Sequence, residues 1–202
     1  MADLNEKLSP NFTLGELVYS ETAERRTDLK AKQENPPQTV MDSLRYLATK
    51  TLQPIRDKFN FPIHITSGYR SEELNTLIGG VNTSQHVKGE AADCIVSDSF
   101  KTSGNTKTIR DEIESKIKSI TGKQIIPDAN PNFYLFAYIC IHLNELDVDQ
   151  VMHEYGNGNG KPAWVHVSSS TGRDRRQILS IGDQTGKKYV ALSVQQALEL
   201  GV

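Results

Sequence analysis

Residues 84–93 read SQHVKGEAAD, and they place a histidine, a glycine and an aspartate at fixed offsets among small residues. An imidazole and a carboxylate are both zinc ligands. Six residues separate His86 from Asp93, which is too long for two ligands one turn apart on a helix. A turn through Gly89 can instead bring a loop histidine against an aspartate on the incoming strand. The stretch is therefore either an ordinary turn into a strand or half of a metal site.

A third ligand must come from elsewhere in the chain, and the segment Trp164-Val-His166-Val-Ser168 offers one. His166 lies between β-branched residues, beside the only tryptophan. Two histidines, one carboxylate and a water form the open tetrahedral arrangement of catalytic zinc. We interpret the remaining histidines, His64, His142 and His153, as core or surface residues.

These residues resemble a known family. Ser84-Gln-His86-Val-Lys-Gly89-Glu-Ala91-Ala-Asp93 matches the S-x-H-x-x-G-x-A-x-D motif of the zinc D-alanyl-D-alanine peptidases, a family with carboxypeptidases, dipeptidases and phage endolysins that cut L-alanyl-D-glutamate bonds. The likeness runs from about residue 8 to 180, and the opening residues are similar to the N-terminal arm of the carboxypeptidase-like branch. Further matching stretches are Leu8–Leu17, Ser20–Arg26, Ser67–Ser71, Leu74-Asn75, Ile78–Gly80, Asp149-Gln150, Glu154 and Pro162–Ser168.

The resemblance implies roles for individual residues. His86, Asp93 and His166 correspond to the ligands of one zinc ion per chain. Arg70 corresponds to the arginine that meets the substrate carboxylate or the polarised carbonyl, a task suited to a planar guanidinium; the structural alternative is a salt bridge to Glu72 or Glu73. Within the same two motifs, Tyr69 and Ser84 are candidate substrate-binding residues, although a turn-capping role for the Ser84 hydroxyl is a close alternative.

The motifs do not by themselves assign the general base. Several family members carry an acidic residue three positions before the second histidine, and this chain has Ala163 there. Glu154 is the natural replacement, because a hairpin that pairs residue 154 with residue 164 puts Glu154 and His166 on one face, ~7 Å apart. A shift of one residue in that register would separate them. Asp149 is the second candidate, with turn capping as its alternative role, and a site without a base stays open.

We therefore expect a zinc metallopeptidase of the D,D-carboxypeptidase or endopeptidase type. It would hydrolyse peptide bonds in peptidoglycan stem peptides with a metal-activated water, and Glu154 would accept and return the proton. The alternative is a non-catalytic wall-binding or structural module that keeps the fold, as the related hedgehog signalling domain does. A third hypothesis is a component of a phage particle that uses the domain for wall attachment.

The elements that position these residues are short strands and amphipathic helices. Residues 62–67, 91–96, 150–155 and 163–168 have the pattern of strands, with the last two flanking the glycine-rich loop GNGNGKP. A helix of about five turns follows Pro37 and is kinked or divided at Pro54. A short helix begins near Ser71 and stops at Gly79-Gly80, and residues 106–120 form another helix. Residues 133–143 are interpreted as a buried strand, with a helix as the alternative.

This order of elements predicts an α+β fold, with an antiparallel sheet core and flanking helices as in hedgehog and the D,D-peptidases. We expect a single domain over residues 1–202. Residues 1–36 would form an N-terminal arm, polar and irregular over 10–36, and residues 181–202 a C-terminal extension with a further strand and helix of unknown purpose.

Composition excludes several classes. The chain has 202 residues and a net charge of −2, which argues against nucleic-acid binding. It has neither an apolar run of the ~18 residues typical of a membrane span nor an apolar segment in MADLNEKLSP. We therefore expect a monomer that is cytoplasmic in the producing cell and meets the wall after release, in a phage or prophage context. Cys94 and Cys140 lie in apolar runs and are interpreted as buried free thiols, with a disulfide as the alternative.

Overall fold

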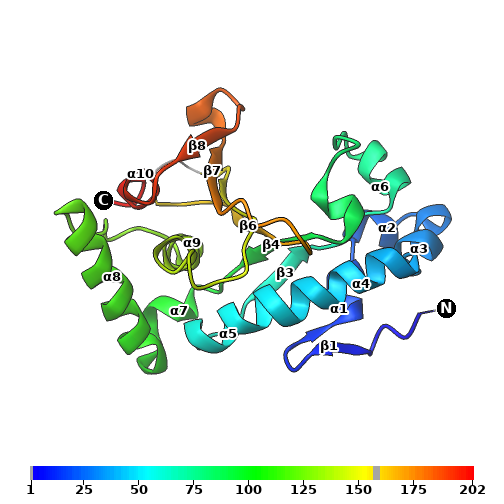
Figure 1. Cartoon of the computed structure of the whole chain (residues 1–202), viewed down its shortest axis with the longest axis horizontal. Helices are drawn as coiled ribbons and strands as arrows, with labels where there is room; N and C mark the ends of the chain where they lie inside the picture. The colour runs from blue at the N-terminus through cyan, green and yellow to red at the C-terminus, as the bar shows by residue number, and fades with distance from the viewer. Residues whose placement is uncertain (1, 157–159) are drawn as a thin grey trace.

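The computed structural model describes residues 2–156 and 160–202, and its centre is a sheet of six strands in the order β3-β4-β6-β5-β7-β8 (Figure 1). The predicted α+β class is confirmed, and all pairs are antiparallel except β5 with β7. The strands are β3 (His64–Ser67), β4 (Ala91–Ile95), β5 (Gln150–Glu154), β6 (Trp164–Ser168), β7 (Gln177–Ile181) and β8 (Val190–Leu192).

The parallel pair makes the sheet mixed, where the sequence pattern predicted antiparallel strands. Ser168 at the end of β6 lies opposite Gln150 at the start of β5, and Gln177 lies on the other side of Gln150. The connection from β6 therefore only has to cross one end of β5 before β7 begins. As a result, β7 runs in the same direction as β5.

The predicted helix around Pro54 is one continuous rod with an irregular middle. It consists of α4 (Gln38–Tyr46), the π-helical segment η1 (Leu47–Leu52) and α5 (Gln53–Phe59). Proline has no N–H and its ring crowds the carbonyl one turn back, so a regular helix cannot pass through it unchanged. The wider π turn before Pro54 absorbs this mismatch, and the helix is neither ended nor divided there.

The N-terminal arm is more ordered than the polar pattern of residues 10–36 predicts. It contains β1 (Lys7–Ser9), β2 (Phe12–Thr13), α1 (Leu14–Val18), α2 (Glu21–Glu24) and α3 (Thr27–Gln33). Thr13 and Glu16 form a capping box at α1, and Ser20 caps α2. The expectation of an irregular arm was wrong because these helices are too short to show an apolar period.

The run at residues 133–143 forms a helix, α9 (Pro131–Ile141), so the predicted strand was wrong. The Asn130 side chain accepts a hydrogen bond from the Phe133 N–H, and Pro131 occupies the first turn. The helix is surrounded by protein and is therefore apolar on all sides. Without one polar face, its sequence cannot be told from that of a buried strand.

The other helices follow their predicted positions. Ser71 caps α6 (Glu72–Leu77) through its side chain, and α8 (Lys107–Thr121) buries the three isoleucines Ile109, Ile113 and Ile117. Residues 181–202 contain β8 and α10 (Val194–Glu199), the strand and helix predicted for the C-terminal extension. The remaining short helices are η2 (Gln85–Lys88), α7 (Ser99–Thr102), η3 (Gly104–Thr106) and η4 (Asp183–Thr185).

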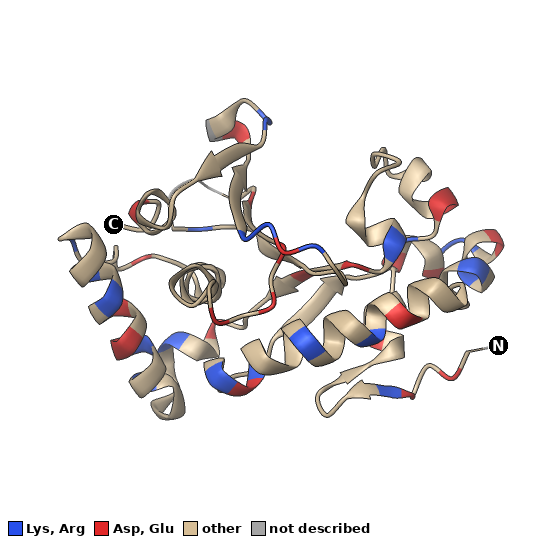
Figure 2. Ribbon diagram, in the orientation of Figure 1, with Lys and Arg blue, Asp and Glu red and all other residues tan. Residues whose placement is uncertain are grey.

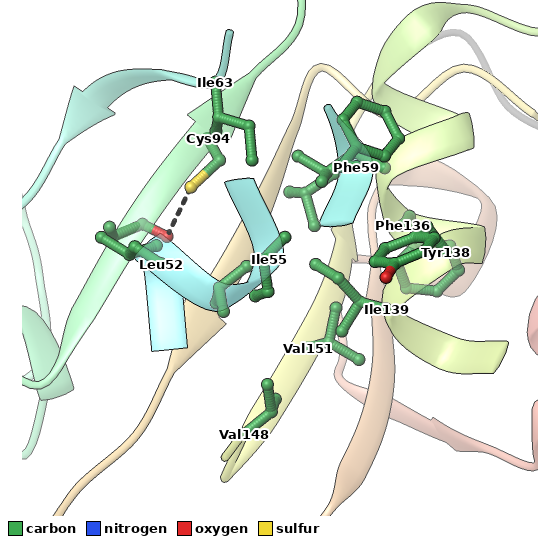
Figure 3. Close-up of a cluster of buried hydrophobic side chains, with 14 of the residues drawn as sticks. Leu52, Ile55, Phe59, Ile63, Cys94, Phe136, Tyr138, Ile139, Val148 and Val151 are labelled. Atoms are coloured by element: carbon green, nitrogen blue, oxygen red, sulfur yellow. Dashed lines mark hydrogen bonds between the residues drawn. The ribbon is translucent and has the colours of Figure 1, made fainter. Parts of the chain in front are cut away.

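One face of the sheet packs against α5 and α9 and forms the centre of the core (Figure 3). Cys94 and Val151 point from β4 and β5 toward Leu52, Phe59 and Ile139 of the helices. Both cysteines are buried free thiols, as predicted. The same core cluster includes residues from both ends of the chain, from Leu8 to Leu198. This leaves the opposite face of the sheet for the polar residues of the candidate site.

The surroundings of that face differ at the two ends of the sheet. In Figure 1, the β7–β8 hairpin and the segment with α6 rise toward the same side, away from α4 and α5. Figure 2 shows lysine and arginine interspersed with aspartate and glutamate along α4, α5 and α8.

Within residues 2–156 and 160–202, the structure has no helix with the length and apolarity to cross a membrane. The middle of the predicted glycine-rich loop, residues 157–159, lies outside the described residues.

Candidate metal centre and active site

Three side chains converge on the polar face of the sheet. Asp93 on β4 lies directly opposite His166 on β6, and directly paired residues of neighbouring strands point to the same face. His86 joins them from η2, which precedes β4. All three residues are buried.

Local sequence explains why His86 reaches this point. Gly89 ends η2 with a φ of +69°, and a Cβ there would lie 2.9 Å from a side-chain carbon of Val40. The Nδ1 of His86 is 2.7 Å from the carbonyl oxygen of Gly68, so Nδ1 carries the proton and Nε2 faces the other two residues. The Gly89 turn and the Gly68 carbonyl together orient the ring.

The turn that carries Gly68 rests on the N-terminal arm. A Cβ at Gly68 would lie 2.2 Å from the carbonyl oxygen of Leu17 in α1, so only glycine permits this approach. The N–H of Tyr69 donates to the same Leu17 oxygen at 2.7 Å. The arm therefore supports the backbone that orients His86.

The donor atoms are spaced as a small metal ion requires. His86 Nε2 lies 3.3 Å from Asp93 Oδ1, His166 Nδ1 lies 3.2 Å from the same oxygen, and the two nitrogens are 3.2 Å apart. Zinc binds nitrogen and oxygen at ~2.0–2.1 Å in a tetrahedron, which separates neighbouring ligands by about 3.3–3.4 Å. Because neutral imidazoles and a carboxylate are all lone-pair donors, the donor set and its spacing fit zinc.

Neighbouring side chains keep Asp93 ionised. Burial alone would disfavour the carboxylate, but the two histidines outweigh burial and keep the pKa of Asp93 well below its ordinary value. Arg70 adds a hydrogen bond from Nη2 to Asp93 Oδ2 at 2.9 Å, and its Nε donates to Ser67 Oγ. Asp93 is thus an anion under ordinary conditions, with one oxygen facing the histidines and the other facing Arg70.

Arg70 does not form the salt bridge with Glu72 or Glu73 that was the alternative prediction. Its partner is Asp93, and Glu73 pairs with Lys32. The Arg70 side chain is 20% exposed and also lines a recess of about 210 Å³ formed with residues 19–22 of the arm and with α6. Its Nη1 meets no acceptor among the described residues, which leaves the two N–H groups of Nη1 for a ligand.

Glu154 lies on the same face of the sheet as the cluster of His86, Asp93 and His166. The observed register pairs Glu154 with Trp164 and Met152 with His166, which is the predicted hairpin register. Glu154 and His166 are therefore diagonal neighbours on one face. The indole Nε1–H of Trp164 donates to Glu154 Oε2 at 2.7 Å.

The pKa of Glu154 is raised, and burial is the largest cause. The proximity of His166 and the hydrogen bond from Trp164 oppose this rise, and the charge of Asp93 adds to it. A carboxylate whose pKa is raised is a better proton acceptor than an ordinary one. The position and the pKa of Glu154 both suit a general base.

Asp149, the second candidate for the general base, makes structural hydrogen bonds instead. It is fully buried, and its two oxygens accept hydrogen bonds from Arg173, Arg175 and Gln85, the neighbour of His86. Burial would raise the pKa of Asp149, but the contacts with Arg175 and Arg173 lower it overall. Asp149 therefore ties the β6–β7 connection to η2 and has no free oxygen to act as a base.

The remaining predicted residues lie apart from the cluster. Tyr69 belongs to the hydrophobic core and is 6% exposed, and burial raises the pKa of its hydroxyl. Ser84 is the N-cap residue of η2, but its side chain makes no capping hydrogen bond. Ala163 is exposed, and its N–H donates to the carbonyl oxygen of Glu154.

The other three histidines are outside the cluster, as predicted. His64 is exposed, and His142 lies near Glu112 and Glu145. His153 is buried on the opposite face of the sheet, against the ring of Phe136. Sequence interpretation missed Ser67, which holds the Arg70 side chain, although its place at the end of a predicted strand beside Gly68 was a usable signal.

Comparison with known proteins agrees with this geometry. The family model of Peptidase M15 matches residues 10–119, which is more than half of the chain and includes Arg70, His86 and Asp93. Curated proteins give no significant match. His166 and Glu154 lie outside the matched segment, and the fold places them on the same face of the sheet as Asp93. With its matched segment and its His-Asp-His cluster, the chain belongs to the Peptidase M15 family of zinc metallopeptidases.

Proposed function

We propose that this protein hydrolyses peptide bonds in peptidoglycan stem peptides, with one zinc ion held by His86, Asp93 and His166. The observation that carries the proposal is the convergence of three buried donor atoms, 3.2–3.3 Å apart, on the sheet face that also carries Glu154. The family membership supports the peptidase class. We further propose that residues 1–202 act as one domain, since a single core cluster includes residues from both ends.

The side chains around the metal have separate roles. A zinc ion bound there supplies Lewis acidity, which activates water and polarises a carbonyl. Glu154 accepts the proton of the attacking water while Trp164 holds its Oε2 in position, and it then donates that proton to the leaving amine. The raised pKa of Glu154 suits both steps, because the carboxyl must take up a proton and release it again.

Arg70 is the anion-binding group of the proposed site. Asp93 and Ser67 hold its Nη2 and Nε, so the guanidinium plane is oriented before substrate arrives. The remaining donors can bind a substrate carboxylate or the oxygen that develops negative charge. Ser84 stands two residues before His86 at the start of η2, and its place in the motif is what supports a substrate-binding role.

A free substrate carboxylate at Arg70 favours cleavage next to a chain end. We therefore propose a carboxypeptidase of the D,D type, with an endopeptidase as the other outcome of the assay. The non-catalytic wall-binding module rests on the missing acid at Ala163. The position of Glu154 on the site face supplies a carboxylate and favours the enzyme.

The test is mass spectrometry of products released from defined muropeptides by the zinc-loaded protein. We expect release by the wild type and a loss of about 10²–10⁴-fold in Glu154→Gln, the range that general-base catalysis covers. Glu145→Gln is the matched control, because Glu145 is an exposed glutamate that pairs with Lys58 and His142. Full release by Glu154→Gln would refute Glu154 as the base, and no release by the wild type would refute the enzyme.

A further inference from the structure

The β7–β8 hairpin belongs to the C-terminal part of the chain, beyond the segment matched by the family model. Tyr189 lies directly before β8 and is 63% exposed. Nothing in the proposed catalytic machinery uses this residue. Large exposed aromatic side chains near an active site are suited to bind ligands, because they bury much area at a low entropy cost.

The sheet register places Tyr189 on the face of the metal cluster. Glu154 pairs with Trp164 on one side and with Ile181 on the other. Ser180 pairs with Val190 in the antiparallel β7–β8 hairpin, so the next position opposite Ile181 is Tyr189. Directly paired residues point to the same face. Trp164, Glu154 and Ile181 are paired in one row across the sheet, and Tyr189, directly before β8, extends that row by the same register.

The electrostatic environment of Tyr189 agrees with this placement. The pKa of its hydroxyl is raised, first by loss of solvent and then by the charges of Glu154, Tyr155 and Asp93, while Arg70 opposes the rise. These groups belong to the candidate site or adjoin it. The next residue, Val190, is also exposed but alternates to the other face of the sheet.

Tyr189 and Arg70 stand on opposite sides of the metal cluster. Arg70 follows β3 at one edge of the sheet, and Tyr189 precedes β8 at the other edge. If Arg70 binds the carboxyl-terminal side of the substrate, the chain on the acyl side of the scissile bond runs toward Tyr189. Two strand spacings separate Glu154 from Tyr189, about 9–10 Å. An extended peptide covers that distance in about three residues.

We propose that Tyr189 is a substrate-binding residue that contacts the third residue on the acyl side of the scissile bond and selects for longer stem peptides. This inference rests on the proposed peptidase function and deepens it. The flat ring would pack along the peptide backbone and the aliphatic part of that residue's side chain. Tyr189 would act on binding, and Glu154 would act on the chemical step.

The experiment compares two synthetic stem peptides that carry either one or three residues on the acyl side. We expect Tyr189→Ala to raise KM for the longer peptide about tenfold, the cost of losing one aromatic anchor, with kcat and the short peptide unchanged within about twofold. Tyr189→Phe should keep most of the binding, because the ring and not the hydroxyl makes the contact. Val190→Ala, on the other face, is the matched control. Equal effects on both peptides, or none, would overturn the proposal.

A second measurement separates this inference from the proposed reaction. Binding of the uncleaved peptides is followed by calorimetry in the Glu154→Gln protein, with and without Tyr189→Ala. Length-dependent binding that needs Tyr189 supports the inference even if the wild type cleaves neither peptide, a result that would refute only the reaction. Binding that is independent of Tyr189 overturns the inference even when the wild type is fully active.

Discussion

His166 and His153 are two buried histidines in neighbouring strands of one sheet, and they differ in almost every contact. His166 faces Asp93 and His86 on the polar face. His153 faces Phe136 on the helix-covered face, and neither ring nitrogen has a hydrogen-bond partner among the described residues. The face on which each side chain lies, and not its burial, separates the candidate ligand from the core histidine.

The comparison of His166 with His153 also shows how strongly the site depends on the register of the β5–β6 pair. Met152 and Glu154 point to the face of His166, while His153 between them points to α9. A shift of one residue in the β5–β6 register would exchange Glu154 for His153 on the site face. The register is set by Val151 and Val165, which are fully buried on the helix side.

The largest effect on stability is expected at His153. Burial lowers the pKa of His153 to about 4 from an ordinary value of 6.5, so the unfolded chain binds the proton more tightly than the folded protein. Stability from this group is complete above pH 6.5 and is lost as the pH falls toward 4, by about 3 kcal/mol at 1.36 kcal/mol per pKa unit. His153→Leu should flatten this loss, as measured by urea unfolding at several pH values.

The control for that prediction is His64→Gln, which removes an exposed histidine from the same sheet. It should leave the pH dependence of the unfolding free energy unchanged. If His153→Leu keeps the wild-type slope between pH 6.5 and 4, His153 has a partner in solution that stabilises its charged form, and the contrast with His166 would disappear.

A smaller effect, on the pH dependence of activity, is expected at Trp164, which hydrogen-bonds to Glu154 and is not one of the candidate ligands. Its indole N–H donates to Glu154 and opposes the rise in the pKa of that carboxyl. Trp164→Phe should raise the pKa further and move the acid limb of the kcat/KM profile to higher pH by about one to two units, since a hydrogen bond to a charged group contributes about 1.5–3 kcal/mol. Tyr155→Phe, next to the same indole ring, should leave the profile unchanged.

The proximity of His86 and Asp93 could be predicted because short-range signals specify it, whereas His166 lies 73 residues beyond Asp93 in the sequence. Gly89 enforces the turn after His86, and small residues follow before Asp93, so the sequence alone indicates how these two meet. The pairing of Glu154 with Trp164 also followed from the alternation in two short strands. These features depend on local chemistry, which a single sequence contains.

Features that depend on distant contacts were not predictable in the same way. The helix α9 is apolar on all sides because of what surrounds it, and so it resembled a strand. Arg70 pairs with Asp93, 23 residues away, where nearby glutamates were expected. The place of Tyr189 depends on the register of three successive strand pairs, which no local pattern specifies.

The most direct test of the site face is the zinc content of three purified proteins, measured by inductively coupled plasma mass spectrometry at neutral pH. We expect about one zinc per chain in the wild type and in His153→Leu, and strongly reduced zinc in His166→Ala, which loses one of three donor atoms. Circular dichroism of each variant confirms that the fold is retained. A full zinc content in His166→Ala, or a wild type that binds no zinc from excess metal, would contradict the assignment.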